Sequence, residues 1–430
     1  MNELSPLPYK GTRDYYPEDK QLQNYIFEIW RKVCESYGYQ EYGAPLLEPL
    51  DVYLAKSGQE LASDQTYSFT DKGGRVVAIR PEMTPSVSRL VAARRQEMPY
   101  PARLYSIANF MRYERPQKGR EREFWQLNVD IFGVDSVLAD AEIITISDQI
   151  MKSFGAKSDD YIIRVNNRNL INFMMAQYLG LDSNRAHAMI KLLDRKDKIG
   201  RDEFLDQAIQ MFDENQTENM KKLEKILDAK TMADLPEEIR NNSSVKEIQA
   251  LFTLLERADV KTVVFDSTLM RGLDYYTGTV FEVYDSSPEN NRSLFGGGRY
   301  DGLVGLFGAE SLSAVGVAPG ATVLEQFLDI HNLLPKLESK TDAYVCVVGS
   351  SQKGANYLAK ALRDSGLNIE VDISDRKLDR QIKTADKKKI PYVIIVGEEE
   401  IAKSEYVIKN LETGAELRAS IDDLILKLKK

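Results

Sequence analysis

Residues 105–133 form the stretch that most restricts what this chain can fold into. Residues 104–111 are largely apolar, and residues 124–132 alternate, with Gln126 and Asp130 among apolar neighbours. Both patterns are typical of β-strands. Pro116 and Gly119 lie between the two segments and favour a turn. The stretch therefore predicts a long β-hairpin with an extended tip.

The predicted hairpin tip is rich in cations. Basic side chains surround two acids between residues 112 and 122, and they are Arg112, Arg115, Lys118, Arg120 and Arg122, with Glu114 and Glu121. A guanidinium can donate two parallel hydrogen bonds to phosphate oxygens. The tip is thus suited to a polyphosphate ligand, although a solvated, charged hairpin end without a ligand would have the same composition.

Length and charge limit the broad class of protein. At 430 residues with 43% hydrophobic content, the chain can bury more than one core, so we expect two or three domains. The net charge of −9 argues against a protein coated all over for nucleic acid. A net charge of this sign is still compatible with a basic track on one part of the surface.

Histidine and cysteine are scarce, which limits the chemistry. With only His187 and His331, neither a zinc site nor a Ser-His-Asp triad is expected, and we predict no protein-ligated metal. Cys34 and Cys346 lie in apolar surroundings, as reduced core thiols do. The N-terminal residues lack an apolar signal core, and no apolar run reaches membrane length. We therefore expect a cytoplasmic protein.

A rigid polar loop follows a predicted hairpin at residues 66–79. Its sequence, Arg80 to Pro85, holds two prolines around Glu82, Met83 and Thr84. Such a loop presents polar side chains from a fixed backbone, and the Glu82 carboxylate could hold an ammonium group. A simple helix N-terminus with a Thr-Pro cap explains the same residues.

Changes in composition and in hydrophobic pattern along the sequence suggest three further regions. Residues 169–242 are charged and helical in pattern, which predicts a helical insertion within a first domain of residues 1–333. Residues 334–341 read as a linker. Residues 342–430 alternate between strand and helix patterns and predict a small α/β domain with a mostly parallel sheet.

Two glycine-rich segments complete the pattern, RGLDYYTG at residues 271–278 and FGGGRYDG at residues 295–302. Glycines allow a backbone to approach a ligand closely. Neither a phosphate-binding P-loop nor a dinucleotide fingerprint occurs, so a nucleotide would have to be bound in another way.

Together these motifs resemble a known family. Arg112 to Arg115 with residues 124–133 is similar to the second signature motif of class II aminoacyl-tRNA synthetases, and RGLDYYTGTVFE with GGRYDGL resembles the two motifs peculiar to histidyl-tRNA synthetases. The resemblance covers essentially the whole chain. It implies an α+β fold, with an antiparallel-sheet catalytic core, a helical insertion and a C-terminal α/β anticodon-binding domain. It also implies a homodimer that binds histidine, ATP with Mg²⁺, and tRNA(His).

The resemblance also implies roles for individual residues. Arg271 and Arg112 are the expected catalytic cations, and Arg112, Glu114, Arg120 and Arg122 the expected ATP site. The expected histidine site comprises Glu82, Met83, Thr84, Gln126, Asp130, Tyr275 and Tyr276, with Asp130 and the Tyr276 phenol as partners of the imidazole. Gln117 and Lys118 are candidates for the tRNA acceptor end. Adenylate formation needs positioning and cationic stabilisation more than a nucleophile, which suits a site rich in arginine.

Two positions depart from the family pattern. The third class motif usually carries an arginine where GVAPGATVL places Val323, and Trp125 stands where histidine or tyrosine is usual. Either the chain belongs to a variant branch that manages without that arginine, or ATP binding is impaired.

Two alternatives to an enzyme keep the same fold. One is a synthetase-like regulatory protein, such as the subunits of the histidine-pathway phosphoribosyltransferase, which usually lack the C-terminal domain and degrade the Arg112 and RGLDYY regions. The other is a tRNA-binding sensor module, which usually lies inside a larger chain. The intact motifs and C-terminal segment favour the enzyme.

Overall fold

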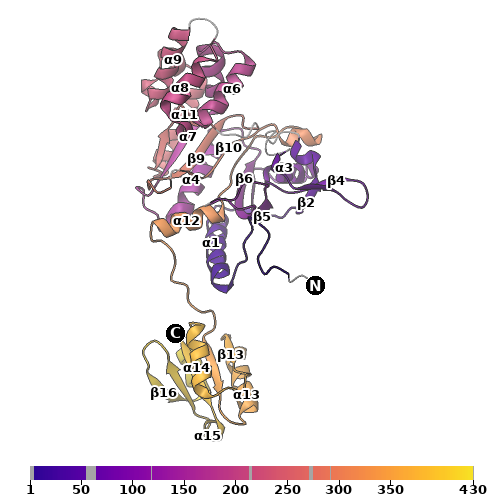
Figure 1. Cartoon of the computed structure of the whole chain (residues 1–430), viewed down its shortest axis with the longest axis vertical. Helices are drawn as coiled ribbons and strands as arrows, with labels where there is room; N and C mark the ends of the chain where they lie inside the picture. The colour runs from indigo at the N-terminus through magenta and orange to yellow at the C-terminus, as the bar shows by residue number, and fades with distance from the viewer. Residues whose placement is uncertain are drawn as a thin grey trace. The chain divides into compact units, whose positions relative to one another are not determined.

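The computed structural model describes residues 4–54, 64–117, 119–212, 216–270, 275–290 and 292–429. The chain divides into two compact units, residues 1–334 and 335–430 (Figure 1). The first unit contains a large and a small sheet, the second unit contains one sheet, and each unit has its own apolar core. Within the described residues, no helix combines the length and the hydropathy needed to span a lipid bilayer.

The first unit is built on an eight-stranded sheet with the order β1-β5-β6-β11-β10-β9-β7-β8. The five junctions from β5 to β7 are antiparallel, and the edge strands β1 and β8 join in parallel. The sheet is therefore antiparallel at its centre, as expected. Its strands are β1 (Gln40–Glu41), β5 (Ala102–Met111), β6 (Glu123–Phe132), β7 (Tyr161–Asn167), β8 (Val263–Phe265), β9 (Thr279–Asp285), β10 (Ser293–Arg299) and β11 (Ala314–Val317).

The predicted long hairpin is confirmed as β5 and β6. Their register runs unbroken from Ala102 beside Phe132 to Met111 beside Glu123. Side chains of a strand alternate between the two faces of the sheet. Residues 127, 129 and 131 of β6 belong to an apolar cluster, so residues 126, 128 and 130 face the other way.

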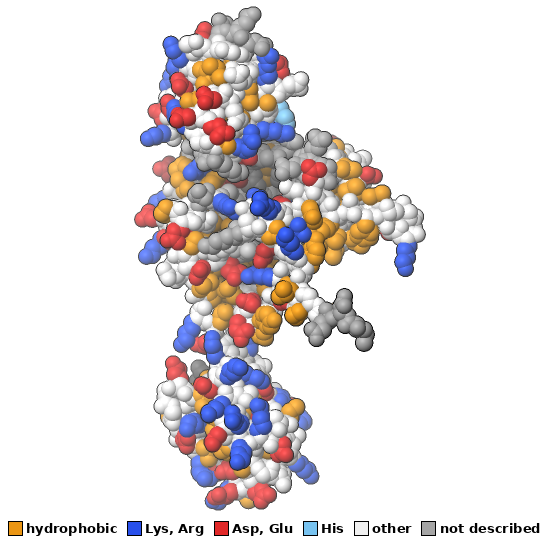
Figure 2. Space-filling model, viewed as in Figure 1, with side chains coloured by type: hydrophobic (Ala, Val, Ile, Leu, Met, Phe, Trp, Pro, Cys, Tyr) orange, Lys and Arg blue, Asp and Glu red, His pale blue; other side chains and the backbone are white. Residues whose placement is uncertain are grey.

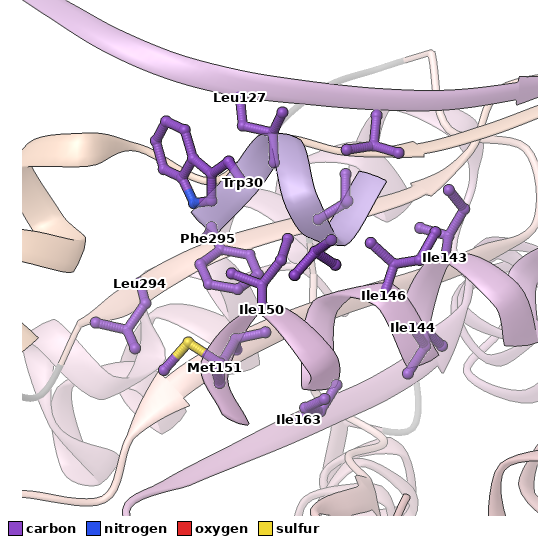
Figure 3. Close-up of a cluster of buried hydrophobic side chains, with 14 of the residues drawn as sticks. Trp30, Leu127, Ile143, Ile144, Ile146, Ile150, Met151, Ile163, Leu294 and Phe295 are labelled. Atoms are coloured by element: carbon purple, nitrogen blue, oxygen red, sulfur yellow. The ribbon is translucent and has the colours of Figure 1, made fainter. Parts of the chain in front are cut away.

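Three helices cover the apolar face, namely α1 (Pro17–Ser36), α4 (Val137–Ser153) and α12 (Ala321–Ile330). Figure 3 shows Trp30 from α1, Leu127 from β6 and Ile150 from α4 pointing toward a shared centre. Cys34 is buried in the same cluster, as expected, and carries no disulfide. The other face of β6 is left for polar chemistry.

The helical insertion lies between β7 and β8. It buries apolar side chains of its own, among them Phe204, Leu223 and Ile226, which are almost fully enclosed. Figure 1 shows α6, α8 and α9 gathered together. The elements are α5 (Arg168–Phe173), a π-helical turn (Met174–Tyr178), α6 (Ser183–Asp194), α7 (Lys196–Ile199), α8 (Arg201–Ile209), α9 (Gln216–Asp228), a 3₁₀ turn (Met232–Asp234), α10 (Glu237–Arg240) and α11 (Ser243–Arg257).

A small antiparallel sheet of three strands carries the loop that holds Glu82. Its order is β2 (Leu47–Pro49), β4 (Val76–Ile79) and β3 (Ser68–Thr70), with α2 (Asp51–Leu54) beside it. Strand β4 leads through residues 80–83 into α3 (Thr84–Ala93). Large apolar side chains on and around this sheet are exposed, and Figure 2 shows orange side chains over this part of the first unit.

The second unit has a five-stranded sheet with the order β13-β12-β14-β15-β16. Strand β12 is parallel to β13 and β14, but β15 is antiparallel to β14 and to β16. The prediction of a mostly parallel sheet was therefore wrong for the last two strands. Parallel neighbours need a long crossover, and residues 411–415 between β15 and β16 are only enough for a hairpin turn. The elements are β12 (Ala343–Val347), α13 (Gln352–Asp364), β13 (Ile369–Val371), α14 (Leu378–Lys387), β14 (Tyr392–Val396), α15 (Glu398–Lys403), β15 (Tyr406–Asn410), β16 (Glu416–Ala419) and α16 (Ile421–Leu428).

Candidate active site

On the polar face of β6, the residues beside Asp130 in the neighbouring strands are glycines, so backbone and not side chains borders this face. Asp130 pairs with Gly316 of β11, which in turn pairs with Gly298 of β10. A Cβ atom at Gly316 would lie 2.2 Å from Asp130 Oδ1, and one at Gly298 would lie 2.8 Å from Cδ1 of Tyr276. Only glycine fits at these two positions, which together form the glycine floor of the site.

A chain of contacts joins four segments that are far apart in sequence. The Tyr275 hydroxyl donates to Oε2 of Glu82 at 3.1 Å. The Tyr275 ring meets the rings of Tyr276 and Tyr300, with centroids 5.0 Å and 6.0 Å apart. The Tyr300 hydroxyl donates to Oδ1 of Asp130. All five residues are buried, so the structure brings Glu82, Asp130, Tyr275 and Tyr276 together, as the sequence predicted.

The environment of Asp130 strongly perturbs its carboxyl group. Burial raises the pKa of its carboxyl to about 7, against the opposing hydrogen bond from Tyr300. Its second oxygen, Oδ2, is buried and has no hydrogen-bond partner among the described residues. The same is true of Nδ2 of Asn128 and the hydroxyl of Tyr42. Buried polar groups are rarely left unpaired, so these three atoms mark a place for a polar ligand.

The loop before α3 is locked to the base of the hairpin tip. Nε of Arg112 donates to the carbonyl of Pro81 at 2.9 Å, and its guanidinium lies 5.2 Å from the Phe124 ring centroid. Met83 is fully buried against residues of β5, so its side chain supports the loop from below. Thr84 starts α3. The proposed phosphate cation and the proposed amine ligand, Glu82, are thus held on adjoining backbone segments.

The remaining arginines of the tip have different environments. Glu114 lies between Arg112, at 3.9 Å, and Arg120, at 3.2 Å, and the Arg120 side chain is 56% exposed. Arg122 is only 8% exposed. It donates to the hydroxyl of Tyr9 and to the carbonyl of Glu114, and it lies 4.2 Å from the Tyr113 ring centroid. Arg122 therefore fastens the N-terminal segment to the tip, whereas Arg120 is available to a ligand.

Four other candidate residues from the sequence analysis remain. Nε2 of Gln126 donates to the carbonyl of Ala318 at 3.1 Å. Oε1 of Gln117 accepts a hydrogen bond from Arg292 at 3.0 Å on the surface. Arg271 and Lys118 lie outside the described residues.

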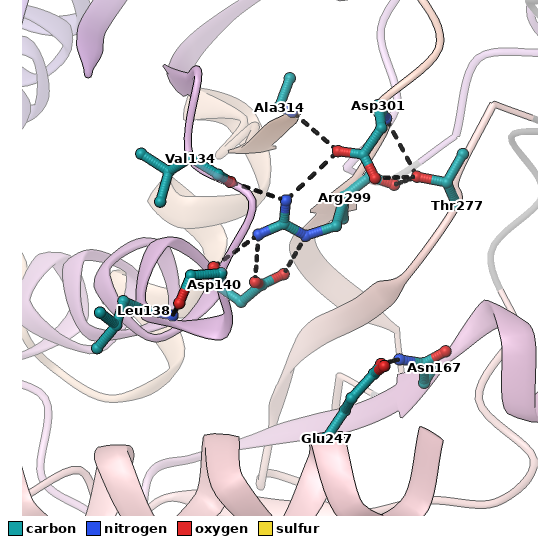
Figure 4. A network of polar contacts seen from close by, with 10 residues as sticks. Val134, Leu138, Asp140, Asn167, Glu247, Thr277, Arg299, Asp301 and Ala314 are labelled. Atoms are coloured by element: carbon teal, nitrogen blue, oxygen red, sulfur yellow. Dashed lines mark hydrogen bonds and ion pairs between the residues drawn. The ribbon is translucent and has the colours of Figure 1, made fainter. Parts of the chain in front are cut away.

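A buried ion pair that the sequence analysis did not predict fixes the end of β10. Arg299 contacts Asp140 of α4 at 2.5 Å and also donates to the carbonyls of Val134 and Ser136 (Figure 4). Asp301 takes a further bond from the same guanidinium. This network holds the strand from which the next residue, Tyr300, reaches Asp130.

Val323 stands beside a cation from another segment. Its side chain packs against the apolar cluster under the sheet. Nη2 of Arg13 lies 2.7 Å from Glu325 in the same helix, and Nε lies 3.3 Å from Glu121. The helix without the expected arginine thus still has a guanidinium next to its first turn.

Comparison with known proteins places this geometry in a family. A family model described as histidyl-tRNA synthetase matches residues 11–322, and one described as an anticodon binding domain matches residues 342–430. The chain belongs to the histidyl-tRNA synthetase family. Among relatives in this family, the histidine–tRNA ligase of Leptospira biflexa is 39% identical over 432 residues, covering 100% of this chain and 98% of its own. That of Haloarcula marismortui is 37% identical, covering 95% and 94%.

A solved histidyl-tRNA synthetase has the same architecture. The crystal structure from Nostoc sp. PCC 7120 matches with a TM-score of 0.78 at 25% identity and covers 100% of this chain and 99% of its own. The predicted family and fold class are confirmed.

Sequence reasoning missed three residues of this synthetase site. Tyr300 follows the GGGR run, so its motif was recognised but its own contact was not. Asn128 alternates with the predicted Gln126 and Asp130, and the strand period alone could have found it. Tyr42 lies in an extended segment with no chemical signal.

Proposed function

We infer that this chain is a histidine–tRNA ligase, which activates histidine with ATP and transfers the histidyl group to tRNA(His). Relatives with this activity match over their full length. The observation in the site that supports this function is the buried Asp130 carboxylate. Tyr300 donates to one of its oxygens, and the other has no hydrogen-bond partner among the described residues.

For the amino acid, we propose that Glu82 and Thr84 bind the α-amino group. Glu82 is buried beside Tyr275, so its carboxylate is oriented before a ligand arrives. Asp130 would accept a hydrogen bond from the imidazole, with Tyr275 and Tyr276 lining the ring. Gln126 would contact the amino acid from the same strand, and Met83 would support the loop.

For ATP, we propose that Arg112 holds the α-phosphate and that Arg120 lies nearer the outer phosphates, with Glu114 orienting both. Arg122 would act by holding the tip in shape. One carboxylate oxygen of histidine attacks the α-phosphorus, the bond from that phosphorus to the bridging oxygen breaks, and pyrophosphate leaves. ATP would be used with Mg²⁺, which neutralises charge on the phosphate oxygens.

Arg271 remains the proposed catalytic cation for this step. Removing a group that stabilises developing charge costs about 3 kcal/mol or more, roughly a hundredfold in rate. Arg271→Ala should therefore lower histidine-dependent exchange by at least that factor. A change of only a few-fold would exclude the role.

The remaining assignments are proposals about partners. Residues 1–333 would activate histidine, and residues 342–430, beyond the linker 334–341, would bind the anticodon, with Gln117 and Lys118 near the acceptor end.

A homodimer is favoured by the exposed apolar side chains around the three-stranded sheet, which are Leu46, Leu47, Leu54, Phe69 and Val76. We propose that the protein acts in the cytoplasm.

The test of the function is amino-acid-dependent exchange between ATP and pyrophosphate, with each amino acid in turn. Exchange with histidine alone is the expected result, and it would show that Val323 is tolerated. Histidine binding without exchange would instead indicate a regulatory paralogue.

A further inference from the structure

Tyr42 lies on the same face of the sheet as Asp130. It follows edge strand β1, and its backbone N–H donates to the carbonyl of Tyr105 in β5 at 2.8 Å. Gln40 is beside Leu104 in the parallel pairing, and Leu104 is beside Asp130 in the hairpin. Because side chains alternate along a strand, Tyr42 points to the Asp130 side.

The Tyr42 ring packs against two apolar clusters in the first unit. It contacts the small cluster that contains Met83, at the loop proposed to bind the amino group. It also contacts the larger cluster that contains Tyr275, Tyr276 and Tyr300. Tyr42 therefore lies on the Asp130 face of the sheet, opposite the face covered by α1, α4 and α12. The phenols of Tyr42 and Tyr300 both have a pKa raised by burial and by the Asp130 carboxylate, so the two tyrosines share its surroundings.

The hydroxyl of Tyr42 is buried and has no hydrogen-bond partner within the described parts of the chain. Burial, together with the nearby Asp130 carboxylate, raises its pKa well above the usual value for tyrosine. The group is therefore an O–H donor at any physiological pH. Oδ2 of Asp130, also unpaired, is an acceptor when ionised.

An unpaired donor and an unpaired acceptor on one face match one ligand group closely. A neutral imidazole has one N–H donor and one acceptor nitrogen on the same flat ring. A phenyl or aliphatic side chain would leave both protein atoms unpaired, which is how a site rejects an apolar competitor.

We propose that Tyr42 is a specificity-determining residue, whose hydroxyl donates to one imidazole nitrogen of histidine while Asp130 Oδ2 accepts from the other. The inference rests on the proposed function and deepens it. The competing hydroxyl is that of Tyr276, whose ring lies against the glycine floor at Gly298.

The test compares Tyr42→Phe with Tyr276→Phe and with a matched control, Tyr105→Phe. The Tyr105 hydroxyl contacts Glu35 and Glu41, away from the site. Each full-length variant is assayed by exchange for the KM of histidine and the kcat. Each is also assayed for inhibition by 3-(2-thienyl)alanine, which has a five-membered ring without ring nitrogens.

Tyr42→Phe should raise the KM for histidine roughly tenfold, the effect of losing one hydrogen bond to a ligand. The inhibition constant of thienylalanine and the kcat should stay within about twofold, since neither depends on that bond. Tyr105→Phe should change none of these values. Because the lost hydroxyl is unpaired without ligand, Tyr42→Phe should also keep or raise the thermal midpoint of unfolding.

Three results would overturn the proposal. The first is an unchanged KM or equal losses for histidine and thienylalanine in Tyr42→Phe, and the second is a nitrogen-selective loss in Tyr276→Phe alone. The third is a Tyr42→Phe chain that fails to fold, because it would show that the hydroxyl is paired. A wild-type chain without histidine-dependent exchange would instead refute the proposed function, and the inference with it.

Discussion

Replacing Asp130 with asparagine should stabilise the unliganded chain above neutral pH and at the same time weaken histidine activation. Burial raises the pKa of this carboxyl from the usual 3.8 to about 7. The folded chain therefore binds the proton more tightly than the unfolded chain does. A contribution of this sign is fully present below pH 3.8 and is lost as the pH rises through 7.

The magnitude follows from the two pKa values. Ionising Asp130 in the folded chain costs about 1.7 kcal/mol of folding stability at pH 5 and about 4 kcal/mol at pH 8. Asparagine does not titrate, so the difference in stability between variant and wild type should move by about 2.5 kcal/mol in favour of the variant over this range. The Tyr300 hydroxyl can still donate to the amide oxygen.

Urea unfolding of both chains at pH 5 and pH 8, at one protein concentration, measures this change. Glu310→Gln is the control, because that side chain is 84% exposed and should shift stability by no more than a few tenths of a kcal/mol at either pH. A stability difference between wild type and Asp130→Asn that moves by less than about 0.5 kcal/mol would refute the reasoning. In the exchange assay, the amide N–H in place of Oδ2 should lower kcat/KM for histidine roughly a hundredfold.

Three further substitutions test the surroundings of the site. Arg299→Met should destabilise the first unit by about 3–5 kcal/mol in thermal or urea unfolding, because it leaves Asp140 buried without its cation. Gly316→Ala should cost about 1–3 kcal/mol in the same assay and lower the affinity for histidine in calorimetry, because the added methyl would overlap Asp130. Arg112→Lys should raise the KM for ATP about tenfold in exchange without changing histidine affinity, because lysine lacks the forked geometry.

The sequence was most informative where structure is local. The β5–β6 hairpin follows from alternation and from turn residues within one short stretch of the chain. The directions of β15 and β16 could not be predicted in the same way, because strand direction depends on pairing and not on pattern. Periodicity shows that a strand exists but not which strand lies beside it.

The site shows the same limit. Glu82, Asp130 and the two tyrosines at 275 and 276 were predicted because they lie in motifs. Arg120 and Arg122 could not be distinguished from the sequence, since only the folded chain brings Tyr9 against the guanidinium of Arg122. The role proposed for Tyr42 could not be predicted either, because it depends on a hydroxyl that has no partner in the described parts of the folded chain.

The glycine floor has a consequence for how this protein sorts amino acids. Its height is set by the hydrogen-bonded ladder of central strands β10 and β11, so it cannot be lowered by a change of rotamer. In the proposed histidine site, a ring larger than imidazole would meet this backbone, while a smaller or apolar side chain would leave the Asp130 carboxylate without a partner. The proposed site would then select by size at the floor and by hydrogen bonding at Asp130, an arrangement that would make a separate editing step unnecessary.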